Sequence, residues 1–255
     1  MPTRAPGTPV NIPELSAARG KIGKVEAWNK FGYNTNVGTA YEVIWENGNG
    51  YTGWLQSAGT VSVTSSSAND DATPGSANAH KIVIEGLDAS FNEVSETITL
   101  NGTAAVTGSQ SFIRVYRAYV TDVGVYDNTN AGNIVIQISG NIVAIIGAGF
   151  GQTEMALYTV PAGKTLYLMR VTGFQDSNKD VLIQLKQRQN ADDTSAPVTG
   201  VRTMRVLSMP AGGQAHLESN GSITFPAKTD IWVEAKATAA GDGVTVMMNG
   251  YLVDD

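Results

Sequence analysis

The sequence predicts an all-β protein with two jelly-roll or β-sandwich domains and an extended, proline-rich N-terminal arm. Three observations lead to this prediction. Short segments rich in apolar and β-branched residues recur about every ten residues, which is typical of sandwiches and barrels. Turn signals such as Asn-Gly and Pro-x-Gly separate these segments. No segment keeps apolar residues at positions i, i+3, i+4 and i+7 over three turns, so we expect little helix.

The arm is predicted over residues 1–35. Four prolines fall in its first part, namely Pro2, Pro6, Pro9 and Pro13. Their fixed backbone angles favour an extended segment over a packed element. Two outcomes stay open for such an arm: a frayed terminus, or a segment that is ordered by lying on a neighbouring subunit.

The first sandwich is predicted over residues 36–150. Residues 80–88 and 93–102 are expected to form a hairpin, and Ser139-Gly140-Asn141 is expected to join a second pair of strands. Further strands are expected at residues 41–45, 60–65 and 111–124. The polar stretch 66–79 is typical of a loop.

The second sandwich is predicted over residues 151–255. In residues 181–190 the polar side chains alternate with apolar ones, which places Gln184, Lys186 and Arg188 on one face of a strand. Other strands are expected within residues 155–175, 201–213, 214–228, 229–239 and 243–255. The glycine-rich stretch near residues 147–155 marks the predicted boundary. Whether the two halves fold independently or interlock stays open.

The composition limits the possible functions. The chain has 255 residues, of which 42% are apolar, so it can form a sizeable core. Only 16% of the residues are charged and the net charge is −6, which argues against broad electrostatic binding to nucleic acid. There is no cysteine, so disulfides and Cys-based zinc sites are excluded. We expect no signal peptide, no membrane-crossing segment and synthesis in the cytosol.

Residues 145–165, IIGAGFGQTEMALYTVPAGKT, contain two sequences similar to nucleotide-binding loops. The dinucleotide fingerprint needs a third glycine where Gln152 stands, and then a helix, for which the segment before Pro161 is too short. The phosphate-binding loop needs its first glycine where Tyr158 stands, and a helix after Thr165, where β-branched and aromatic residues follow instead. Both sequences are therefore predicted to be turns, and no nucleotide cofactor is expected.

No constellation of side chains indicates catalysis, so we do not expect an enzyme. His80 and His216 have no second ligand at metal-like spacing, and surface or interface positions are expected for both. Asp70-Asp71 lacks the spacing of a calcium loop, and a solvated loop is expected there, as for Asp192-Asp193. Metal ions and other cofactors are therefore not expected.

Four large aromatic residues cluster in the first 55 positions: Trp28, Trp45, Tyr51 and Trp54. Burial or contact with another subunit is the preferred interpretation, because such residues bury a large apolar area. A platform on which carbohydrate rings stack is the alternative.

Four segments of the chain resemble tailed-phage virion structural proteins. They are IVIEGLDASFNEVSETITLNGTAAVTGSQSFIRVYRAYV (82–120), NAGNIVI (130–136), GFGQTEMALYTVPAGKTLYLMRV (149–171) and FPAKTDIWVEAKATA (225–239). The resemblance covers scattered blocks of residues 35–255 and leaves the proline-rich arm uncovered. It implies jelly-roll-like domains and a virion location after assembly in the host cytoplasm.

From this resemblance we expect a non-enzymatic capsid decoration (cement) protein, trimeric and bound to the major capsid protein or other virion proteins. Nucleic acid and membranes are not expected partners. The alternative is a tail-associated or fibre-base protein that binds host glycans. Partner contacts are expected at Pro2, Arg4, Pro6, Pro9, Pro13, Arg19, Trp28, Phe31 and Tyr33. Aromatic residues anchor interfaces well, and an arm with little core of its own becomes ordered only on a partner.

Overall fold

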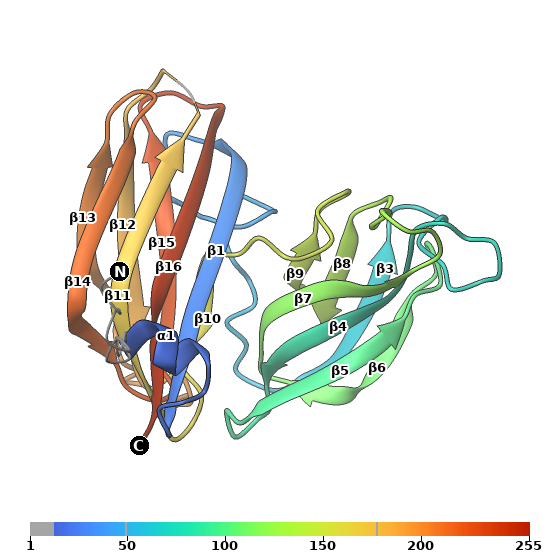
Figure 1. The fold of residues 1–255 in the computed structure, drawn as a ribbon, viewed down its shortest axis with the longest axis horizontal. Helices are drawn as coiled ribbons and strands as arrows, with labels where there is room; N and C mark the ends of the chain where they lie inside the picture. Colours follow the sequence, from blue (N-terminus) through green and yellow to red (C-terminus); the bar gives the residue numbers. More distant parts are fainter. Residues whose placement is uncertain (1–12, 49, 177) are drawn as a thin grey trace, which may run out of the picture.

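The computed structural model describes residues 13–48, 50–176 and 178–255. One short helix, α1 (Pro13–Ala18), precedes the strands β1 to β16 within these ranges. Figure 1 shows the strands gathered into two lobes, a large one that contains both ends of the described chain and a smaller one beside it. The predicted all-β fold with two sandwich domains is confirmed.

The large lobe, which we call the large sandwich, has two antiparallel sheets. The first has the order β1 (Val25–Val37), β16 (Asp242–Asp254), β11 (Lys164–Gln175), β14 (Gln214–Phe225). The second has the order β10 (Leu157–Thr159), β15 (Asp230–Ala237), β12 (Val181–Arg188), β13 (Arg202–Met209), and the short β2 (Glu42–Val43) also pairs with β15. The chain changes sheet at most of its connections, which is the jelly-roll arrangement.

The small lobe, which we call the small sandwich, is inserted between β2 and β10. One of its sheets has the order β6 (Val106–Phe112), β3 (Gly59–Ser65), β8 (Ile134–Ile138), β9 (Asn141–Ile146). The other has the order β5 (Glu93–Thr99), β4 (Ala79–Leu87), β7 (Arg114–Val123). Each sandwich encloses a hydrophobic core of its own, and Tyr116 packs against both cores.

The predicted arm and domain boundaries differ from the structure. Residues 25–37 are not part of an extended arm, because they form β1, which pairs with β16 from Val25↔Val253 onward. The first sandwich does not begin at residue 36, because β2 pairs with β15 of the large sandwich. The jelly roll therefore takes strands from both sides of the insertion, and the two halves of the chain interlock.

Several local predictions are confirmed. β4 and β5 form the expected hairpin, in which the Asp88 carboxylate accepts backbone hydrogen bonds from Ser90 and Asn92. Ser139 and Gly140 join β8 to β9 with positive φ angles of 50° and 82°. β12 alternates between buried and half-buried residues. In the described residues, no helix is both long enough and apolar enough to pass through a membrane.

The two sequences similar to nucleotide-binding loops are turns. Gly149 and Gly151 have φ angles of 82° and 71°, and they lie between β9 and β10 without a helix after them. Gly163 has a φ angle of 71° and stands directly before β11, so a strand follows it instead of a helix. Neither stretch has the strand-to-helix geometry on which phosphate binding depends.

Candidate functional site

The two connections between the sandwiches run side by side. Trp45, on the outgoing connection, forms an antiparallel bridge with Met155, on the returning one. The Ala156 amide donates to the Ile44 carbonyl at 2.8 Å, and the Ile44 amide donates to the Val233 carbonyl at 2.9 Å. The connections are thus hydrogen-bonded to each other and to the sheet that contains β15.

A buried ion pair joins the sandwiches beside these connections. Arg114 on β7 donates from Nε and Nη2 to the two carboxylate oxygens of Asp230 on β15, both at 3.0 Å. Both side chains are 2% exposed. A guanidinium and a carboxylate joined by two parallel hydrogen bonds form one of the stronger ion pairs found in proteins.

Neighbouring groups satisfy the remaining hydrogen-bonding capacity of this pair. Arg114 Nη1 donates to the Leu55 carbonyl at 2.7 Å and to the Ile113 carbonyl at 2.9 Å. Thr159 Oγ1 donates to Asp230 Oδ1 at 2.6 Å. A buried charge is tolerated only when it is paired and hydrogen-bonded in this way.

The aromatic residues that the sequence analysis singled out lie mostly at the same junction. The rings of Trp45 and Tyr51 are 5.0 Å apart, those of Tyr51 and Trp54 are 4.9 Å apart, and those of Trp54 and Trp232 are 5.4 Å apart. The Tyr51 hydroxyl donates to the Val143 carbonyl, and burial raises its pKa. The preferred interpretation, burial, is therefore confirmed for Trp45 and Tyr51.

Charged residues cross the junction on its other side. Lys164 Nζ lies 3.1 Å from Glu26 of the large sandwich and 3.0 Å from Glu93 of the small sandwich. Burial alone would lower the pKa of Lys164, but its hydrogen bonds to Glu93 and Glu26 outweigh burial and raise the pKa. Lys30 on β1 donates to the Tyr116 carbonyl of β7.

Desolvation of its amine lowers the pKa of Lys30, a half-buried residue, to about 7; repulsion from Arg117 adds to this effect and attraction to Glu85 opposes it. In the unfolded chain its pKa returns to about 10.4. Between these values the unfolded state binds more protons, so Lys30 makes the free energy of unfolding rise with pH. We expect Lys30→Met to flatten this rise between pH 7 and 10 in urea denaturation. An unchanged slope would contradict the assignment.

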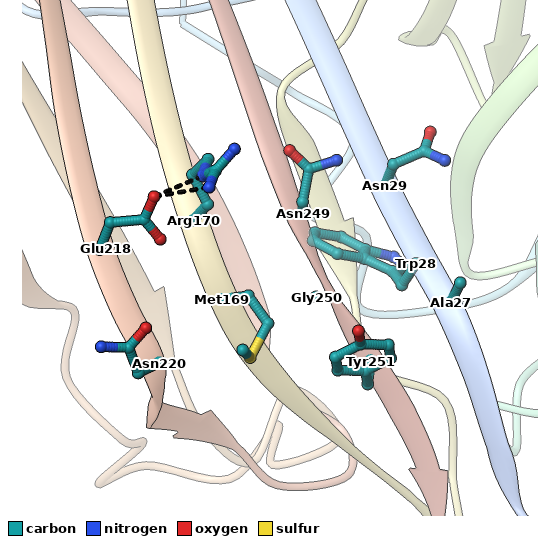
Figure 2. A pocket seen from close by; sticks show the side chains of 10 residues that line it. All are labelled: Ala27, Trp28, Asn29, Met169, Arg170, Glu218, Asn220, Asn249, Gly250 and Tyr251. Atoms are coloured by element: carbon teal, nitrogen blue, oxygen red, sulfur yellow. Dashed lines mark hydrogen bonds and ion pairs between the residues drawn. The ribbon is translucent and has the colours of Figure 1, made fainter. Parts of the chain in front are cut away.

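The outer face of the sheet β1-β16-β11-β14 carries the second candidate surface. The register of the four strands aligns their outward side chains in rows that cross the sheet. One row consists of Asn29, Asn249, Arg170 and Glu218. Figure 2 shows these residues around a depression of about 430 Å³, with Met169 and Tyr251 on its lower side. A second depression adjoins it, because Arg170 and Asn249 line both.

The polar groups of this outer face are linked to one another. Arg170 Nε donates to Glu218 Oε1 at 2.7 Å, and His216 Nε2 lies 2.7 Å from the same oxygen. The hydrogen bond from Arg170, and to a smaller extent the one from His216, lowers the pKa of Glu218. Trp28 lines the depression and is 7% exposed, and its Nε1 has no hydrogen-bond partner among the described residues.

The predicted partner contacts fall into three groups. Pro2, Arg4, Pro6 and Pro9 lie outside the described residues. Pro13 is the first residue of α1, and Arg19 is exposed after that helix. Phe31 and Tyr33 are half-buried on β1, whereas Trp28 packs on Tyr158 with ring centroids 5.2 Å apart. Trp28 therefore belongs to the interior and to the floor of the depression, and a partner contact at this residue stays a prediction.

One acidic residue was missed by sequence reasoning. Asp70 was expected in a solvated loop, but its side chain is buried and accepts hydrogen bonds from the Ala131 and Gly132 amides at 2.7 and 2.9 Å. Ser65 Oγ donates to it at 2.5 Å. Asp70 thus fixes two loops of the small sandwich. The described part of the chain contains no group of three or more acidic, His or Cys side chains placed to hold a metal ion.

Comparisons with known proteins add little. No protein-family model matches the chain, and no curated protein matches it in sequence. Among solved structures, the chain is similar to one of the infectious bursal disease virus Gx strain, with 11% identity, 89% of this chain and 76% of that chain covered, and a TM-score of 0.22. The T=1 particles derived from infectious bursal virus give 11% identity, coverage of 91% and 74%, and a TM-score of 0.23. At TM-scores this low the likeness carries no argument about this chain.

Proposed function

We propose that this chain is a non-enzymatic structural component of a phage virion, and specifically a capsid decoration (cement) protein. The observation that carries the proposal is the hydrogen-bonded junction between the sandwiches. Two adjacent backbone connections and the buried Arg114–Asp230 pair join the two sandwiches. A protein that holds neighbouring capsid subunits together must resist bending between its own contact surfaces. The sequence resemblance to virion structural proteins supports the same role.

In this role the protein acts through many repeated contacts. Its partners are the major capsid protein or other virion proteins, and it assembles as a homotrimer in the host cytoplasm before it joins the virion. Contacts of modest strength suffice on a lattice, because each further contact forms at high effective concentration. The arm of residues 1–20 and the outer face of the β1-β16-β11-β14 sheet are the surfaces that we assign to these contacts.

The test is addition of the purified protein to phage heads that lack it. We expect the full-length chain to co-sediment with heads and to cover their surface, as seen by electron microscopy. A chain without residues 1–20 should bind less or not at all. Failure of the full-length chain to bind heads, or its presence only at the tail, would contradict the cement role.

The alternative is a tail-associated or fibre-base protein that binds host glycans. The observation that favours it is a pair of loops of the small sandwich in which Tyr126 is 91% exposed and Val125 and Phe150 are also exposed. Asn130 joins the loops, because its carbonyl and side-chain oxygen accept the Gly149 and Gly151 amides. Since Trp45 and Tyr51 are buried, a glycan would have to stack on these loops.

A further inference from the structure

We propose that the outer face of the β1-β16-β11-β14 sheet is the docking groove for the proline-rich segment, residues 1–12, of a neighbouring copy of this chain. The inference deepens the proposed function and rests on it, since an arm that joins copies has a role only in an assembly. It assigns a receiving surface to the predicted arm and a physical basis to the predicted trimer.

The groove has apolar walls at positions that sheet register fixes. Tyr251 and Met247 alternate with inward residues along β16, and Phe174 stands on the neighbouring β11. Met247 is 43% exposed and Phe174 is 40% exposed, so this face presents large apolar side chains on its outer side. Aromatic walls of this kind receive proline rings, which are flat and apolar.

The groove also presents hydrogen-bond donors along its length. Asn249 lines both depressions, and Asn29 lies beside it in the same row of side chains. Trp28, which packs on Tyr158 in the interior, lines the floor of the first depression.

The proposed occupant has the complementary chemistry. The sequence of residues 1–12, MPTRAPGTPVNI, has prolines at positions 2, 6 and 9. Such a segment favours the polyproline II conformation, in which the backbone makes no internal hydrogen bonds and its carbonyls stay free to accept. The apolar rings fit the walls of the groove, and the free carbonyls fit the amide donors of Asn29 and Asn249.

The length of the segment fits the groove. In the polyproline II conformation twelve residues span roughly 37 Å. The outward residues of β16 from Thr245 to Tyr251 span roughly 20 Å of sheet. The segment can therefore follow the whole groove and still bridge from one copy to the next.

The position of α1 points to a neighbouring copy. α1 packs against β1, which is the edge strand of its sheet, and Figure 1 shows it across the lower ends of β1 and β16. The segment that precedes Pro13 therefore joins the described chain beside β1, and its reach of roughly 37 Å allows it to extend beyond its own copy. Passing an arm from each copy to the next around a ring closes a cyclic assembly.

The first experiment measures the mass of the full-length chain in solution by light scattering. We expect a trimer for the unaltered chain and dissociation for Tyr251→Ala and Phe174→Ala, which remove the walls of the groove. Tyr126→Ala removes an exposed aromatic side chain elsewhere and serves as the matched control, with no change in mass. Thermal unfolding of each variant shows whether the fold is kept.

The second experiment adds a synthetic peptide of residues 1–12 to a chain that lacks them, a truncation that removes no described residue. We expect binding that Tyr251→Ala weakens about tenfold or more, as for an interface anchor. A peptide with glycine in place of all three prolines should bind about tenfold more weakly. Binding should also shift the indole N–H resonance of Trp28, which Trp28→Phe assigns.

Two results would overturn the inference. One is a peptide that does not bind, or that binds equally to folded Tyr251→Ala and Phe174→Ala chains. The other is a monomeric full-length chain that excludes the peptide, which would place the segment on its own copy. Neither measurement uses phage heads, so a chain that exchanges arms but ignores heads would remove the cement role and keep the inference.

Discussion

Replacing Arg114 with alanine is expected to destabilise the protein by about 3–5 kcal/mol, because the Asp230 carboxylate would stay buried without its partner. The Leu55 and Ile113 carbonyls would lose a donor at the same time. Urea denaturation measures the loss. Because the pair joins the two sandwiches, limited proteolysis should also cut the connections between them faster in the Arg114→Ala chain than in the unaltered chain.

The surface pair of Lys81 and Asp122 is a suitable control for this prediction. Its atoms are 2.9 Å apart, close to the distances in the buried pair, but its side chains are 44% and 47% exposed. Lys81→Ala should therefore cost far less stability than Arg114→Ala. Replacing both buried partners, as Arg114→Met with Asp230→Leu, should recover much of the lost stability. A loss for Arg114→Ala no larger than that for Lys81→Ala would show that the pair does not hold the junction.

Gly32→Ala should destabilise the protein by about 3 kcal/mol or more, although it adds a single methyl group. A Cβ atom at this position would lie 2.2 Å from the Ala156 nitrogen and 2.6 Å from the Ile44 oxygen. Both are backbone atoms of the two connections, so a change of side-chain rotamer cannot relieve the clash. β1 would have to move away from the junction, and chemical denaturation should report the loss.

Gly200→Ala is the control for Gly32→Ala. A Cβ atom at Gly200 would have no neighbour within 4 Å, and the φ angle of Gly200 is not positive. It should change stability by less than about 1 kcal/mol, and a small gain is expected from the stiffer unfolded chain. Equal stability of Gly32→Ala and Gly200→Ala would mean that the contact between β1 and the connections tolerates expansion.

The sequence predicted those features that depend on neighbouring residues. The β4–β5 hairpin and the β8–β9 pair follow from turn residues that stand between their own strands. The pairing of β1 with β16 could not be predicted in this way. The alternation of apolar and polar residues indicates a strand but does not show which other strand it pairs with. The Arg114–Asp230 pair could not be predicted either, because its two residues are 116 positions apart in the sequence.

The contrast between features set by nearby residues and features set by distant ones also explains which candidate surfaces could be predicted. The aromatic residues near the N-terminus suggested burial correctly, because such residues bury a large area in most settings. The outer face could not be predicted, since it combines single residues of β1, β16, β11 and β14 that only the sheet brings together. Asp70 was misjudged because its partners, the Ala131 and Gly132 amides, belong to a loop about 60 residues later.

The place of the small sandwich within the large one has a consequence for synthesis on the ribosome. The strands of the small sandwich lie between residues 59 and 146, so all of them are available as soon as that stretch has emerged. β1 emerges earlier, but its partner β16 is the last described strand to be made. Until then β1 has an unpaired edge that other nascent chains could join. The sheet β1-β16-β11-β14 can therefore be completed only after this last described strand has been made.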